Sequence, residues 1–144
     1  FHEGEFDEIG VPSGYLNSKG DTIIPIEKYY YCYTDTIRDF GMVIERETGK
    51  IIGIDENATE LFEVFKYDNG PDFSENGIIR IIKNGKIGYA NSKGEIVVEP
   101  YYKYASRFIN GTAKVSNNEI NGCENPWFPS QYIEIDLNGT EIKK

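Results

Sequence analysis

The chain has 144 residues, enough for one domain with a sizeable core, and its 39% hydrophobic and 27% charged residues are typical of a folded globular protein. No apolar run is long enough to span a bilayer, so we expect no membrane insertion. The net charge of −9, with no local cluster of Lys and Arg, argues against nucleic-acid binding and leaves solubility or a basic protein partner as explanations of the acidity.

In chain order, the first clear feature is a heptapeptide that occurs twice, as GYLNSKG at 14–20 and as GYANSKG at 88–94. The stretch IGIDENATE at 52–60 lies midway, and YIEIDLNGTEIK at 132–143 is a weaker fourth copy. Self-similarity with a period of about 37 residues is typical of arrays of one supersecondary unit. We therefore expect a single repeat domain, with a partial repeat at 1–13, repeats at about 14–50, 51–86 and 87–130, and a partial repeat at 131–144.

Each repeat predicts a three-stranded antiparallel meander. In the best-preserved copy, the alternating residues 86–91 indicate a strand, and Asn91–Gly94 has the composition of a hairpin turn. The β-branched residues 95–99 indicate a second strand, which we expect Pro100 to end, and residues 112–116 indicate a third. Further hairpins are expected at Asn17–Gly20, Thr48-Gly49 and Asn84-Gly85.

The second copy needs one dropped residue to align Gly53 with Gly88. There Ala58 replaces the turn Gly, so we expect Asn57 to adopt the left-handed conformation instead. The alternation of the strands predicts a set of core residues, namely Ile23, Val43, Ile54, Ile81, Ile87, Val97, Val115 and Ile135.

Residues 88–115 resemble the WG-containing repeat, also called the KWG repeat, of bacterial proteins. The matching positions are Gly88, Tyr89, Asn91, Gly94, Pro100, Tyr102, Ala105, Phe108, Gly111, Ala113 and Val115. The Trp that precedes Gly in that family is absent, and Ser13, Ile52 and Ile87 stand in its place. The resemblance implies a β-rich module, in most cases within an exported or surface protein, and it implies no catalytic residues.

The fold class that follows is all-β, an array of three to four meanders that is open and curved rather than closed. Three complete three-stranded units fall short of the number of blades that radial closure generally needs. In an open array, the segment Phe1–Gly10 does not pair with the hairpin at 131–144.

An enzyme is not expected, because His2 is the only imidazole and no nucleophile elbow, phosphate-binding loop or dinucleotide motif occurs. A glycosidase would need only two carboxylates, but Asp55 and Asp136 occupy turn positions, where Asp serves the backbone. Cys32 and Cys123 predict neither a disulfide framework nor a metal site. We expect no cofactor and no metal.

The chain reads best as a noncatalytic scaffold that binds a protein or another ligand, and the alternative is a carbohydrate-binding or carbohydrate-active module. The candidate binding residues are aromatic and comprise Tyr29, Tyr31, Tyr33, Tyr101, Tyr104, Trp127 and Phe128. In an extended link, Tyr29, Tyr31 and Tyr33 should share one face. The tyrosines could instead form a ladder between repeats, and Trp127, in a long loop, could instead be a hydrophobic cap.

Overall fold

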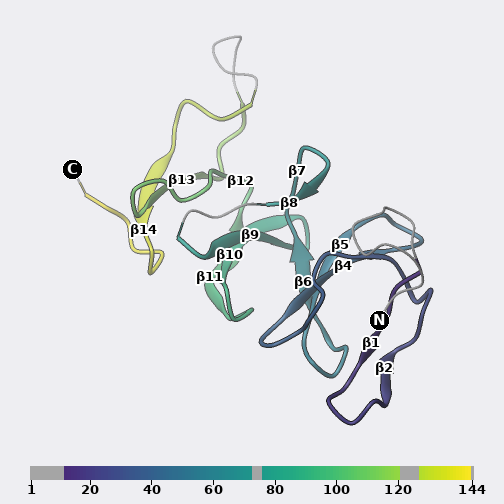
Figure 1. Ribbon diagram of the computed structural model, residues 1–144. Coiled ribbons are helices and arrows are strands. Elements are labelled where there is room, and N and C mark those ends of the chain that lie inside the picture. Colours follow the sequence, from purple (N-terminus) through teal and green to yellow (C-terminus); the bar gives the residue numbers. More distant parts are fainter. Residues whose placement is uncertain (1–11, 73–75, 121–126, 144) are drawn as a thin grey trace. The chain divides into compact units, whose positions relative to one another are not determined.

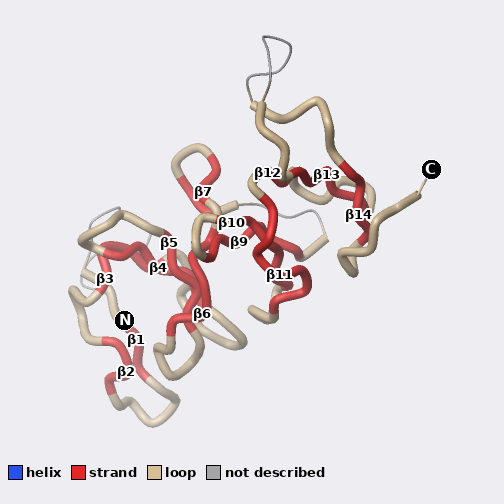
Figure 2. Tube along the Cα trace, turned by 180° about the vertical axis from the view of Figure 1, so that it is seen from behind, coloured by secondary structure: helices blue, strands red, loops and turns tan. Residues whose placement is uncertain are grey.

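The computed structural model describes residues 12–72, 76–120 and 127–143 (Figure 1). All regular elements in these ranges are β-strands, and no helix occurs among them (Figure 2). The strands form open antiparallel sheets and no closed barrel, so the all-β prediction is confirmed. The chain divides into two compact units, Phe1–Pro71 and Asp72–Lys144. The prediction about Phe1–Gly10 lies outside the described residues.

The first unit contains two hairpins and a sheet. Strands β1 and β2 pair with each other, β3 to β6 lie side by side in chain order, and β7 and β8 form a short hairpin. The strands are β1 (Tyr15–Leu16), β2 (Thr22–Ile24), β3 (Tyr29–Cys32), β4 (Gly41–Glu45), β5 (Ile51–Ile54), β6 (Glu60–Val64), β7 (Lys66–Tyr67) and β8 (Gly70–Pro71).

The second unit contains two groups of three strands, β9-β10-β11 and β12-β13-β14. They are β9 (Ile78–Lys83), β10 (Lys86–Asn91), β11 (Ile96–Tyr102), β12 (Tyr104–Ala105), β13 (Thr112–Ser116) and β14 (Ile133–Asp136). The prediction that Pro100 ends its strand is wrong, because β11 continues to Tyr102. Proline is tolerated there because β11 lies at the edge of its sheet, where a missing N–H group breaks no ladder.

The same turn occurs at four places in the chain. It begins at Asn17, Asp55, Asn91 or Asp136. In each case the side-chain oxygen accepts hydrogen bonds from the backbone N–H groups two and four residues later, at 2.8–3.0 Å. These bonds hold Ala58 at a φ of 63°, so the expectation that Asn57 takes the left-handed position is wrong. The expected hairpins at Asn17–Gly20, Asn84-Gly85 and Asn91–Gly94 are confirmed.

Because the turns are equivalent, the repeats align without a gap, and the residue two positions before each turn is Tyr15, Gly53, Tyr89 or Glu134. The alignment of Gly53 with Gly88 is therefore wrong. The buried hydroxyl of Tyr89 donates to the carbonyl of Ser106 at 2.7 Å, and that of Tyr15 donates to the carbonyl of Thr34 at 2.5 Å. In these two copies, the bond connects the first hairpin to the segment that follows its second strand.

The glycine before each tyrosine serves a close approach of backbone to backbone. A Cβ atom on Gly88 would lie 2.4 Å from the carbonyl oxygen of Val98 and 2.5 Å from the nitrogen of Pro100. Gly14 stands in the same relation to Ile24, at 2.4 Å from its carbonyl oxygen. In the second repeat, Gly53 instead makes room for a ring, because its Cβ would lie 2.6 Å from a ring carbon of Phe62. The repeated Gly-Tyr pair is therefore structural in both copies.

Six of the eight predicted core residues are buried, and they are Val43, Ile54, Ile81, Ile87, Val115 and Ile135. The other two predictions are wrong by one position, since Ile23 and Val97 are half-buried while Ile24 and Val98 are buried. Ile24 pairs with Tyr15, and Val98 pairs with Tyr89. Residues directly opposite in an antiparallel pair share a face, so the buried tyrosine selects its partner.

Candidate functional site

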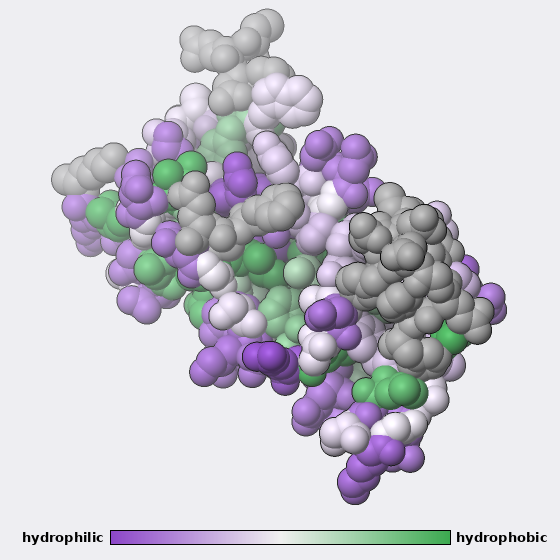
Figure 3. Space-filling model, in the orientation of Figure 1, coloured by the Kyte–Doolittle hydropathy of each residue, from purple (hydrophilic) through white to green (hydrophobic). Residues whose placement is uncertain are grey.

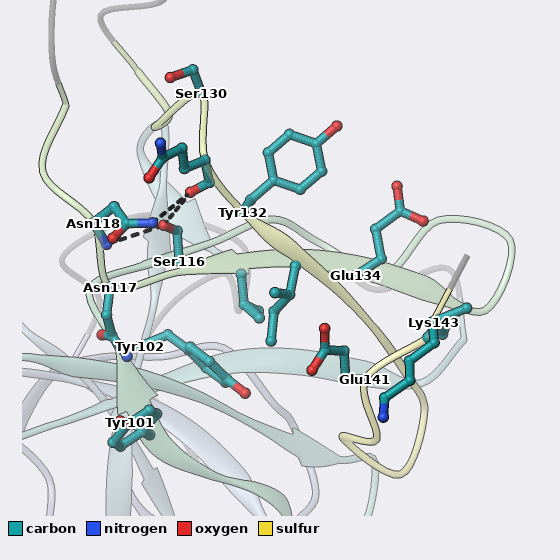
Figure 4. Close-up of a pocket in the computed structure, with 14 residues that line it drawn as sticks. Tyr101, Tyr102, Ser116, Asn117, Asn118, Ser130, Tyr132, Glu134, Glu141 and Lys143 are labelled. Carbon is teal, nitrogen blue, oxygen red and sulfur yellow. Dashed lines mark hydrogen bonds between the residues drawn. The ribbon is translucent and has the colours of Figure 1, made fainter.

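A groove of about 1120 Å³ lies in the second unit, between the end of β11 and the β13–β14 pair. Tyr101 and Tyr102 form one wall, Val115 and Ile133 contribute an apolar floor, and Glu141 stands at the other side. Figure 4 shows the side chains of Tyr102 and Glu141 extending into the same space, whereas Tyr132 and Glu134 extend from the other side of β14. Ile133 is 38% exposed and Tyr101 is 65% exposed, so both apolar and aromatic surface is accessible.

The equivalent residues of the first unit form a packed core. Ala105 pairs with Val115 and Val115 with Ile133, just as Cys32 pairs with Val43 and Val43 with Ile52. Tyr102 precedes Ala105 by three positions, as Tyr29 precedes Cys32. In the first unit, Tyr29, Val43 and Ile52 belong to one buried cluster. Ile52 is only 7% exposed. The positions that line the groove in the second unit are therefore those that form a closed core in the first unit.

In the groove, the partly buried phenol of Tyr102 lies near the carboxylate of Glu141. The pKa of Tyr102 is raised, first because burial disfavours its charged form and then because Tyr101 and Glu141 lie near it. Among the described residues, no cation lies within ion-pair distance of the Glu141 carboxylate. Lys143 lines the groove as well. The groove therefore offers apolar surface, phenolic hydroxyls and the carboxylate of Glu141, which are the contacts of a binding site.

Hydrogen bonds fix one rim of the groove. The hydroxyl of Ser116 donates to the carbonyl of Gln131 at 2.6 Å, and the amide nitrogen of the Asn118 side chain donates to the same carbonyl at 3.2 Å (Figure 4). The two ends of the long connection between β13 and β14 are thereby held together. Preorganisation of this kind lowers the entropy that ligand binding would lose.

The predicted residues Tyr104 and Phe128 lie together beside the groove. Their ring centroids are 6.3 Å apart, and Phe128 lies 6.1 Å from Tyr132. The ammonium group of Lys114 is 4.7 Å from the centroid of the Tyr132 ring. Trp127 is 85% exposed, so its indole is not buried as a hydrophobic cap.

The three predicted tyrosines at 29, 31 and 33 do not share one face. A bulge between Tyr29 and Tyr31 breaks the alternation, so Tyr29 is buried on the same side as Cys32. Tyr31 and Tyr33 are half-buried, with ring centroids 5.0 Å apart. Cys32 is a free thiol whose pKa is raised by burial, and Cys123 lies outside the described residues.

The sequence did not identify three groove residues, Tyr102, Ile133 and Glu141, as candidates. Tyr102 only matches the family pattern, and an isoleucine in a strand is ordinarily a core residue. Only the comparison of Ile133 with the buried Ile52 would have raised the question. A buried ion pair was also missed: Asp72 accepts from Arg80 at 2.7 and 2.9 Å.

On the coloured part of the face drawn in Figure 3, hydrophobic patches lie among hydrophilic residues. In the described ranges, no helix has the length and apolar character that crossing a membrane would require. Those ranges also bring no three His, Cys, Asp or Glu side chains together in a possible metal site.

Comparison with known proteins gives one match. Neither the curated proteins nor the solved structures contain a match to the chain. Residues 87–119 match the family model described as "WG containing repeat", and the match covers the hairpin β10–β11, the link and β13. The same turn recurs in the other three copies outside the matched stretch. Residues 87–119 are therefore similar to a WG-containing repeat, in agreement with the resemblance noted from the sequence.

Proposed function

We propose that the chain is a noncatalytic repeat scaffold and that the groove beside β11 binds an extended segment of another polypeptide. The observation that supports this most strongly is the 38% exposure of Ile133, whose counterpart Ile52 is buried in a packed core. Ile133 is thus accessible next to Tyr102 and Val115, whereas its counterpart in the first unit is covered. Covering such a surface is a main driving force for association.

The lining of the groove favours a polypeptide over a sugar. Val115, Ile133 and Ile142 supply aliphatic side chains, on which an apolar side chain gains free energy but a sugar hydroxyl loses hydrogen bonds to water. The amide of Asn118 and the hydroxyl of Ser116 are already engaged with the backbone of the rim. β11 is also an edge strand of its sheet, and peptides commonly bind beside such an edge.

The test is fluorescence anisotropy with a short labelled probe peptide in which valine alternates with lysine. Ile133→Ser removes the exposed apolar floor and should weaken binding by about 1 kcal/mol, roughly fivefold. Ile109→Ser is the matched control, because Ile109 is 55% exposed and does not line the groove. Equal affinities for both variants, or binding of oligosaccharides but not of the peptide at this groove, would contradict the proposal.

The absence of catalysis and the export of the protein belong to the same proposal. Export is supported by the family resemblance, since such repeats are described mostly in exported or surface proteins. Fractionation of the source cells, with an antibody against the chain, tests it: a purely cytoplasmic signal would refute export. Absence of catalysis would be refuted by glycoside hydrolysis that is lost in an Asp55→Asn or Asp136→Asn variant.

A further inference from the structure

We infer that the polypeptide held in the groove presents a lysine or arginine side chain to Glu141, next to an apolar side chain that packs on Ile133. This inference rests on the proposed function and specifies the chemistry of its partner. The cationic group would lie between the carboxylate of Glu141 and the phenol of Tyr102, both of which extend into the groove (Figure 4). A carboxylate and an aromatic ring together recognise a cation through charge and through the ring quadrupole.

Glu141 is the acidic group best placed for this role. Its counterpart in the first unit is Glu60, which pairs with Ile54 as Glu141 pairs with Ile135. Glu60 lies beside a closed core, whereas Glu141 lines an open groove. Glu141 and Tyr102 line the same groove, and the carboxylate of Glu141 contributes, after burial and Tyr101, to the raised pKa of Tyr102.

The other acidic side chain that lines the groove, Glu134, extends from the other side of β14 (Figure 4). Lys103 forms an ion pair with Glu119. Lys143 lines the groove and would repel a cationic side chain. Residues 72–144, which contain the groove, have nine acidic and nine basic side chains, so the net charge of −9 comes from residues 1–71, which have fifteen and six. Selectivity for a cation must therefore come from Glu141 locally.

The experiment compares three labelled peptides, valine–lysine, valine–glutamate and valine–serine, on the intact chain and its variants. We expect the lysine peptide to bind tightest. Glu141→Gln should weaken its binding by about fivefold without affecting the serine peptide, and Lys143→Gln should strengthen it by about twofold. Glu60→Gln is the matched control, with the same change of net charge away from the groove, and should leave all affinities unchanged.

The outcomes separate the two proposals. If the lysine and serine peptides bind equally and Glu141→Gln changes neither, the cation inference is overturned while the groove remains a peptide site. If Glu60→Gln weakens the lysine peptide as much as Glu141→Gln does, the attraction is nonspecific and the inference fails. If no peptide binds, or if Ile133→Ser has no effect on any of them, the proposed function itself fails.

Discussion

The substitution Gly88→Ala tests whether the backbone of β11 lies directly against Gly88 of β10. The added methyl group would lie 2.4 Å from the Val98 oxygen and 2.5 Å from the Pro100 nitrogen, whereas ordinary contacts begin at 3.4 Å. The backbone of β11 must therefore move by about 1 Å, and overpacking of this kind costs roughly 1–3 kcal/mol. We expect the upper end of that range, because both obstructing atoms belong to the backbone.

Two other glycines are controls for Gly88→Ala in equilibrium urea unfolding. Gly85→Ala adds a methyl with no atom within 4 Å, so only its φ of 71° opposes the change, at about 1 kcal/mol. At Gly53 the obstructing atoms belong to the Phe62 ring, which can turn aside, so the expected loss is about 1 kcal/mol. If Gly88→Ala were as stable as the parent chain, or less destabilised than Gly85→Ala, the close approach of the β11 backbone to Gly88 would be refuted.

Three further predictions concern stability. Val98→Ala should lower the free energy of unfolding by about 2 kcal/mol and Val97→Ala by less than half of that, since only Val98 is buried; equal losses in urea unfolding would contradict the register. Asp72→Asn leaves Arg80 without its buried carboxylate and should cost about 3 kcal/mol or more, and a neutral effect on thermal unfolding would refute the importance of the pair. Burial raises the pKa values of Tyr15 and Tyr89 above their ordinary 10.0, so above about pH 10 the unfolded chain loses protons that the folded chain retains. The free energy of unfolding should therefore fall as the pH rises above 10, and it should fall less steeply in Tyr89→Phe.

Much of the architecture could be predicted because the local sequence determines the hairpin turns. Asn17 and Asn91 start hairpins through local side-chain bonds, which depend on residues two and four positions away. The choice between Ile23 and Ile24 could not be predicted, because adjacent apolar residues do not show which one faces inward. That choice follows from pairing with Tyr15, a residue in another strand.

The groove could not be predicted for a different reason. Ile52 and Ile133 are the same residue at equivalent positions, so local sequence cannot distinguish the buried one from the exposed one. Exposure depends on how closely other segments pack upon each strand. The burial of Tyr29 could not be predicted for a similar reason, because nothing in the sequence YYYCY indicates the bulge in β3 that turns Tyr29 inward.

The measurement that most directly tests the groove as a polypeptide-binding site is a titration of the isotopically labelled chain with the valine–lysine probe peptide, followed by amide chemical shifts. The largest shifts should fall on Tyr102, Val115, Ile133 and Glu141, and the equivalent residues of the first unit, Tyr29, Val43, Ile52 and Glu60, should remain unchanged. Shifts concentrated in the first unit, or absent from both units at saturating peptide, would contradict the account.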